Sequence, residues 1–143
     1  MEDMPAWNPN LRSRAVIMTS DTRYFIDSSI AAGVLAIGPQ DLMNDLNTLG
    51  LLFETMAVRD LRVYADALSG DVFHFRDANG LECDAVLHRR NGTYGLIEIK
   101  LGGNNLIEKG AATLSKLAGK IDTDKMVPPS FMMVLTAVGA YAY

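Results

Sequence analysis

Three strand candidates that follow one another in the middle of the chain constrain its fold more than any other feature. They are residues 72–76, 81–88 and 94–101, and each is rich in the aliphatic and aromatic side chains that favour strands. The two separators, Asp-Ala-Asn-Gly at residues 77–80 and Arg-Asn-Gly at residues 90–92, are strong hairpin signals because they contain the residues that tight turns require. The segment therefore predicts three strands joined by short turns.

The N-terminal third predicts an arm followed by helices. Residues 1–20 mix Pro, Asn, Arg and Ser with no helical periodicity, so we expect an extended arm there. Residues 24–26 predict a short strand, and Asp27 or Ser28 can N-cap a small helix, since their side-chain oxygens accept orphan backbone N–H groups. Residues 41–68 then predict one long helix.

A helix and a last strand follow the three-stranded segment. Asn105, with Glu108 three residues later, resembles a capping box, and apolar residues at helical spacing continue to Ile121. Residues 131–138 form a nearly uninterrupted apolar run, as expected of a strand covered on both faces. The order helix, three strands, helix, strand predicts an α/β fold with a mixed β-sheet flanked by helices. At 143 residues the chain has room for one such domain, which we place at residues 21–143.

Composition narrows the expected environment and partners. A net charge of −4 argues against a surface coated in positive charge, so any contact with nucleic acid must be local. The single cysteine, Cys83, cannot form an internal disulfide. Glu2 and Asp3 stand where a secretory signal carries positive charge, and the apolar stretch at residues 30–37 is too short to span a bilayer. We expect a cytoplasmic protein that does not enter a membrane.

Charged residues at strand positions single out the second and third strand candidates. Strand periodicity places every second residue on one face of a sheet. In the second strand, one face carries Leu81, Cys83, Ala85 and Leu87, and the opposite face carries Glu82, Asp84, Val86 and His88. In the third strand Glu98 and Lys100 share a face.

The register of the hairpin between these strands decides whether Asp84 joins them. A two-residue Asn91-Gly92 turn would pair Asp84 with Ile99. A three-residue loop, with Gly92 in the left-handed conformation that such loops favour, would place Asp84 opposite Glu98. Two ionised carboxylates that face each other repel unless a cation or a proton lies between them. A divalent metal is the economical explanation in that register.

One further carboxylate lies in the predicted long helix. Glu54 sits in a row of apolar residues at helical spacing, away from the polar face, where a charge needs a partner. Asp60 is a weaker candidate, since Arg59 or Arg62 can accompany it at the helix surface.

Together these groups suit metal-assisted cleavage of phosphodiester bonds. Asp84 and Glu98 would hold Mg²⁺, or Mn²⁺ in its place, because Mg²⁺ takes one or two carboxylates together with waters and phosphate oxygens. Lys100 would be a catalytic residue that orients the attacking water or stabilises charge on the phosphate. Glu54 would assist catalysis by completing the shell of the metal, directly or through water.

The same residues resemble a known superfamily. Asp84 followed by Glu98-Ile99-Lys100, behind a helical Glu54, is similar to the PD-(D/E)XK nucleases. A closer resemblance covers nearly the whole chain, because "RYFIDSSIAA", "LGLLFETMAVRDL", "FHFRDANGLECDAV" and "LIEIKLGG" resemble the domain of unknown function 4143. That family forms the C-terminal part of bacterial and archaeal AAA-type ATPases.

The resemblance implies a restriction-endonuclease-like core, with nucleic acid, DNA above all, and an AAA-type ATPase domain of a longer parent protein as partners. No G-x-x-x-x-G-K-[ST] motif for nucleotide binding occurs in this chain. Three departures from the family pattern stand out: the proline of the PD element is absent, Cys83 replaces a β-branched residue, and Ser28 replaces a frequent proline. None of the three removes a proposed ligand.

Plainer interpretations stay open beside this one. Glu98 and Lys100 alone also fit a solvated strand face, and His74 and His88 fit packing or surface roles. Three lysines along the last helix fit either solvation or contact with a phosphate backbone: Lys109, Lys116 and Lys120. A non-catalytic module that binds a protein partner, forms a homo-oligomer or presents DNA to an ATPase is the competing function.

Overall fold

The computed structural model describes residues 1–139 and contains the expected mixed β-sheet. Within those residues the sheet has four strands in the order β3 (Gly70–Arg76), β4 (Glu82–Arg89), β5 (Tyr94–Lys100) and β6 (Phe131–Thr136). β3, β4 and β5 pair antiparallel, whereas β6 runs parallel to β5. The predicted α/β class is therefore confirmed. The last four residues of the predicted domain, 140–143, lie outside the described part of the chain.

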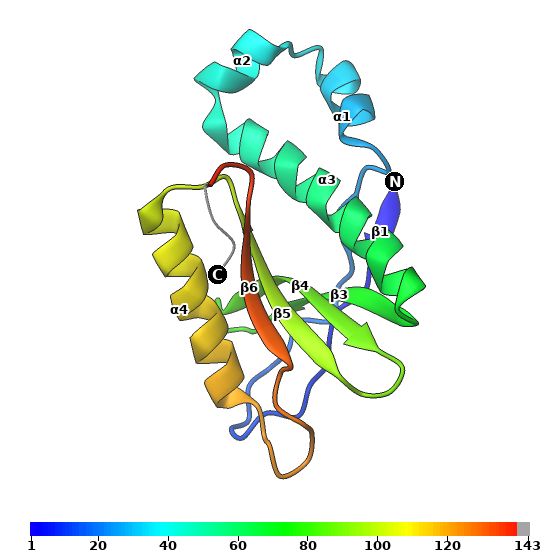
Figure 1. The fold of residues 1–143 in the computed structure, drawn as a ribbon, viewed down its shortest axis with the longest axis vertical. Coiled ribbons are helices and arrows are strands. Elements are labelled where there is room, and N and C mark those ends of the chain that lie inside the picture. Colours follow the sequence, from blue (N-terminus) through cyan, green and yellow to red (C-terminus); the bar gives the residue numbers. More distant parts are fainter. Residues whose placement is uncertain (140–143) are drawn as a thin grey trace.

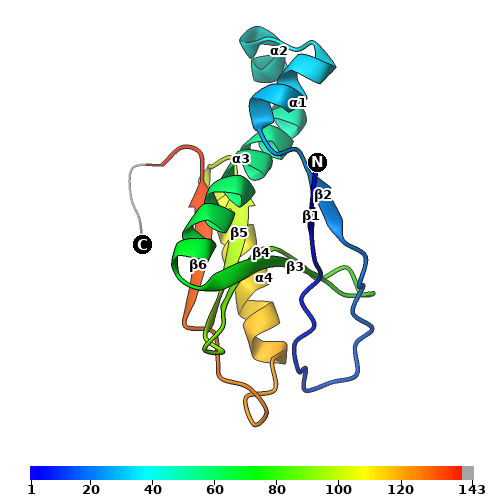
Figure 2. The same ribbon diagram turned by 90° about the vertical axis from the view of Figure 1, so that its right-hand side faces the viewer.

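Two long helices cover the two faces of this sheet (Figures 1 and 2). One core cluster joins α3 (Leu46–Ala67) to the sheet through Val58 and Leu61, which pack with Ile97 and other strand residues. The other joins α4 (Asn104–Lys120) to the opposite face through Leu114 and other apolar residues of the helix. Both faces of β4 and β5 are consequently buried, which explains their nearly continuous apolar sequences.

The long helix predicted at residues 41–68 is in fact two helices. A short helix, α2 (Pro39–Asn44), ends at Asp45, and α3 begins immediately afterwards. The carboxylate of Asp45 accepts hydrogen bonds from the backbone N–H and the hydroxyl of Thr48. This side chain satisfies an N–H group that would otherwise be orphaned, so it favours a new helix start over a continuous helix.

Helix α1 (Ser28–Leu35) precedes α2, and Asp27 caps it as predicted, by accepting from the backbone N–H of Ser29. Helices α1 and α2 lie beside the first half of α3, at the end of the molecule away from the sheet (Figure 1). Within residues 1–139 no helix is long and apolar enough to cross a membrane.

The N-terminal arm is extended, as predicted, and it runs along the open edge of β3. Its first strand, β1 (Glu2–Met4), pairs antiparallel with β2 (Thr22–Tyr24). Between β1 and β2 the arm forms two backbone hydrogen bonds with His74 of β3. The N–H of Trp7 donates to the His74 carbonyl, and the N–H of His74 donates to the Pro5 carbonyl. The arm thereby covers the N–H and C=O groups that an edge strand exposes. The strand predicted at residues 24–26 was placed two residues too late.

Two C-terminal predictions were also wrong in detail. Helix α4 has Gly103 as its N-cap and no capping side chain, so the box predicted from Asn105 does not form. Strand β6 lies at the edge of the described sheet, with Phe131 and Met132 exposed, rather than being covered on both faces. A uniformly apolar run cannot by itself distinguish a central strand from the edge strand of a parallel pair.

Candidate active site

The β4–β5 hairpin adopts the three-residue register. Ala85 pairs with Ile97 and His88 with Tyr94, and the N–H of Arg89 donates to Thr93 C=O at 2.8 Å. Gly92 takes the left-handed backbone conformation that this loop requires, with φ of 89°. This register aligns Asp84 with Glu98 across the two strands.

A β-bulge in β4 changes which way Asp84 points. Phe73 pairs with Val86 and Phe75 with Cys83, so that Asp84 and Ala85 together lie opposite the single residue between them on β3. The expected alternation of faces therefore breaks, and Cys83 packs with the α4 cluster while Ala85 packs with the α3 cluster. Bulges commonly re-aim a side chain beside an active site, and this one turns Asp84 toward the end of β5.

The carboxylates of Asp84 and Glu98 converge on one position, and the Lys100 ammonium lies there. Lys100 Nζ is 3.1 Å from Asp84 Oδ2 and 2.7 Å from Glu98 Oε2. Each carboxylate also accepts a backbone N–H from the opposite strand, Asp84 from Ile99 at 2.8 Å and Glu98 from Asp84 at 3.3 Å. The predicted meeting of three charged side chains thus exists, with the cation between the carboxylates supplied by Lys100.

Burial makes this cluster electrostatically sensitive. The side chains of Glu98, Asp84 and Lys100 are 5%, 18% and 25% exposed. Burial raises the pKa of Glu98, and the Asp84 carboxylate raises it further against the opposing effect of Lys100. Burial acts to lower the pKa of Lys100, but its bonds to Glu98 and Asp84 outweigh that effect, so the pKa is raised and the lysine stays charged.

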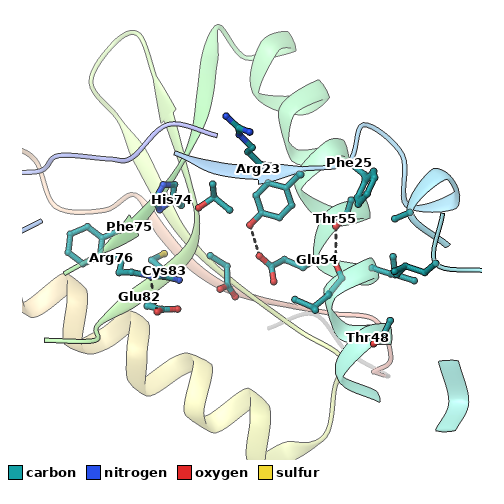
Figure 3. A pocket seen from close by; sticks show the side chains of 17 residues that line it. Arg23, Phe25, Thr48, Glu54, Thr55, His74, Phe75, Arg76, Glu82 and Cys83 are labelled. Carbon is teal, nitrogen blue, oxygen red and sulfur yellow. Dashed lines mark hydrogen bonds and ion pairs between the residues drawn. The ribbon is translucent and has the colours of Figure 1, made fainter. Parts of the chain in front are cut away.

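Glu54 approaches from α3 on the other side of Asp84. Its Oε1 accepts a hydrogen bond of 2.5 Å from the hydroxyl of Tyr24, which β2 supplies. Burial raises the pKa of Glu54, the Tyr24 bond opposes that rise, and Asp84 adds to it. Glu54, Tyr24 and Asp84 line one cavity of about 560 Å³, the α3 pocket, which lies between α3, β2, the end of β3 and the start of β4. Figure 3 shows Glu54 on the helix side of this pocket and Glu82 on the strand side.

A second, polar cavity of about 440 Å³ lies between α4 and the ends of β4 and β5, and we name it the α4 pocket. Asp84, Glu98 and Lys100 line it from the sheet. Helix α4 approaches closely because Gly110 has no side chain, and a Cβ there would lie 3.4 Å from Glu98 Cβ. Asp84 borders both pockets, so the charged cluster is reached from two sides of the sheet.

The sequence profile of one family, Domain of unknown function (DUF4143), matches residues 49–136. The chain belongs to the DUF4143 family. Comparison with curated proteins and with solved structures found no match. Glu54, Asp84, Glu98 and Lys100 all lie within the matched segment of this DUF4143 domain, whereas Tyr24 precedes it.

Asp84 and Glu98 are the two side chains of the cluster that would hold a magnesium ion. No group of three or more His, Cys, Asp or Glu side chains among residues 1–139 is arranged to hold a metal. A metal that replaced the Lys100 ammonium would take one ligand from each carboxylate and its other ligands from water or phosphate, and the oxygens, now 3.1 and 2.7 Å from Nζ, would move in to about 2.0–2.1 Å from the metal. Mg²⁺ accepts that combination, whereas Zn²⁺ and Ca²⁺ sites draw more ligands from the protein.

Other candidates take structural roles in the DUF4143 domain. Asp60 is paired with Arg59 at 3.1 Å, as the plainer interpretation expected. His74 bonds through its ring to the Ser20 carbonyl. Cys83 is buried, and burial raises the pKa of its thiol to about 12, which keeps it unreactive.

Tyr24 is the site residue that the sequence did not reveal. Its only local signal is an aromatic residue in a short apolar strand, and nothing near it in the chain indicates which helix it will meet. A carboxylate isolated in an apolar helical row, as at Glu54, was the better clue, because such a group needs a donor from elsewhere.

Proposed function

We propose that this DUF4143 domain is a metal-dependent nuclease of the PD-(D/E)XK type, which cleaves phosphodiester bonds of nucleic acid, DNA above all. The observation that carries the proposal is the convergence of the Asp84 and Glu98 carboxylates on one cation position, 3.1 and 2.7 Å from Lys100 Nζ. The element order, with α3 before three antiparallel strands and α4 before a parallel fourth, is the order expected of that superfamily.

Each residue has a role that its surroundings support. Asp84 and Glu98 would hold Mg²⁺ or Mn²⁺, and the metal when bound supplies a Lewis acid and an activated water. Lys100, displaced from the two carboxylates by the metal, would bind a non-bridging phosphate oxygen and offset the charge that develops there. Glu54, held by Tyr24 across the α3 pocket, would accept a hydrogen bond from a water at Asp84.

The setting of the domain follows from the family resemblance. We propose that it works in the cytoplasm beside an AAA-type ATPase domain of a longer parent protein. An ATPase that moves along or remodels DNA would bring the strand to the local site, which offsets the low affinity expected from a net charge of −4.

One observation favours the non-catalytic alternative. Large apolar side chains are exposed on α1, α2 and the start of α3: Ile30, Val34, Leu35, Met43, Leu46 and Leu51. Exposed apolar patches of this kind commonly mark protein–protein contacts. In that alternative the domain binds a protein partner or a second copy of itself and keeps the nuclease fold without turnover.

Cleavage assays on DNA and RNA with Mg²⁺ or Mn²⁺ test the proposal. We expect the wild type to cleave the substrate. We expect Lys100→Ala, purified in parallel, to cleave it at least about 100-fold more slowly, which is the loss seen when a hydrogen-bond donor to the transition state is removed. Equal rates in the two proteins would assign the activity to a contaminant or another site. No cleavage by a folded wild type would favour the non-catalytic module.

A further inference from the structure

The wall of the α4 pocket opposite the carboxylates is built from one face of helix α4. Ala112, Thr113 and Lys116 line the pocket from that face, since residues three and four apart are neighbours on a helix. Two of these side chains are small, so the space in front of Glu98 stays open. Lys116 is the long side chain at this wall, and it stands one helical turn from Ala112.

The three lysines of α4 differ in whether they lie at the α4 pocket and whether a carboxylate is already paired with them. Lys120 is tied to Asp77, a fully buried carboxylate, at 3.1 Å. Lys109 is exposed and lies outside the α4 pocket. Lys116 is exposed at the pocket, and within residues 1–139 no carboxylate lies at ion-pair distance from it. Lys116 is therefore the α4 cation that lies at the site with its charge uncompensated.

With a divalent metal bound, the charges around the α4 pocket favour an anion between Lys116 and the cluster. The two carboxylates of Asp84 and Glu98 would then balance the metal, Glu82 is paired with Arg76 at 2.9 Å, and Lys100 and Lys116 would be left with their charge uncompensated. A phosphodiester chain carries one negative charge per nucleotide, so a phosphate at the cluster brings its neighbour within a nucleotide's length. A flexible lysine can pair with that neighbour as a point charge.

We propose that Lys116 anchors the phosphate adjacent to the one that reacts, so that a nucleic-acid strand crosses the α4 pocket between helix α4 and the ends of β4 and β5. This inference rests on the proposed nuclease function and adds the path of the substrate to it. Lys116 acts in binding, and the groups that touch the reacting phosphate are those of the cluster.

Binding of a short fluorescein-labelled DNA strand, measured by fluorescence anisotropy in Ca²⁺ over a range of salt concentrations, tests the path. We expect Lys116→Ala to weaken binding about three- to tenfold at low salt and to reduce the slope of log K against log salt by about 0.7 to 1, since one phosphate contact is lost. Lys116→Arg is expected to retain most of the affinity. Lys109→Ala, the same change on the same helix outside the pocket, is expected to bind as the wild type does.

Two results would overturn the path: equal affinities and salt slopes for Lys116→Ala and Lys109→Ala, whether or not both variants bind more weakly than the wild type, or a wild type that does not bind the strand. The nuclease proposal fails on a different measurement, the equal cleavage by wild type and Lys100→Ala. Because Lys116 is exposed and unpaired among the described residues, thermal unfolding of both α4 variants should match the wild type, which separates a binding effect from misfolding.

Discussion

Replacing Lys100 with methionine removes the cation that lies between two carboxylates while keeping the length of the side chain. Two oxygens that contact the same nitrogen at 3.1 and 2.7 Å can be at most about 5.8 Å apart, and at an effective dielectric constant of about 20 they repel by about 3 kcal/mol. Loss of one partner from a buried ion pair costs about 3–5 kcal/mol in general. Because Asp84 and Lys100 are partly exposed, we expect a loss of about 2–3 kcal/mol at pH 7.

Thermal unfolding with and without Mn²⁺ measures this effect. For a domain of this size the expected loss lowers Tm by roughly 6–12 °C. Mn²⁺ should then stabilise Lys100→Met more than it stabilises the wild type, because the metal no longer competes with the ammonium for the two carboxylates. Binding at one hundred times the Kd contributes about 2.7 kcal/mol, enough to restore most of the loss.

Lys120→Met is the matched control for this experiment. Lys120 is 26% exposed and pairs with one buried carboxylate, that of Asp77, which also accepts the backbone N–H groups of Asn79 and Leu81. Replacement of Lys120 should also lower Tm, but Mn²⁺ should not restore it, since among residues 1–139 Lys120 is paired with the Asp77 carboxylate and with no second one. An unchanged Tm for Lys100→Met, or equal stabilisation of both variants by Mn²⁺, would refute the claim that Lys100 occupies the cation position.

Three further predictions concern the surroundings of the cluster. Burial raises the pKa of Glu54 in the folded protein above its ordinary value of 4.5, so the folded state loses stability as pH rises from about 4.5 and the buried carboxyl must ionise. Glu54→Gln removes this ionisation. The variant should therefore unfold at a higher urea concentration than the wild type at pH 7 and at the same concentration at pH 4. Tyr24→Phe should cost about 1–3 kcal/mol at pH 7 by leaving the Glu54 carboxylate without its donor, and the cost should shrink in the Glu54→Gln background, which a double-mutant cycle in urea would measure. Gly110→Val should cost about 1–3 kcal/mol in the same assay, because its Cβ would meet Val134 at 3.2 Å and Glu98 at 3.4 Å; a neutral effect would show that α4 is free to shift.

The charged cluster was predictable because its determinants are local in sequence. Strand alternation placed Glu98 beside Lys100, and the glycine at residue 92 favoured the loop that aligns Asp84 with Glu98. The bulge at Asp84 was not predictable in the same way, since it depends on how many residues of β3 pair with β4. The break at Asp45 had a visible signal, a cap residue with Thr48 three positions on, which the longer helical pattern outweighed.

The identity of the cation between the carboxylates shows what sequence periodicity leaves open. Facing carboxylates required a positive charge, and divalent metal was the expected one, but the Lys100 ammonium lies at hydrogen-bond distance from both. Periodicity places side chains on faces, whereas the reach of a flexible lysine decides which neighbour it contacts. Tyr24 escaped prediction for a related reason, because its partner Glu54 is 30 positions away in the sequence.

The N-terminal arm has a consequence for where this domain begins. Met4 belongs to the core cluster on the α3 side of the sheet, and Trp7 belongs to the cluster on the α4 side. One short segment beside the β3 edge therefore contributes to the core on both faces of the sheet. A chain cut to residues 49–136, the extent of the family match, would lose both side chains, the donor to Glu54 and the cover of an edge strand. The segment that the family profile matches therefore lacks part of the core of the folded chain, and preparations of residues 49–136 should aggregate rather than report on the site.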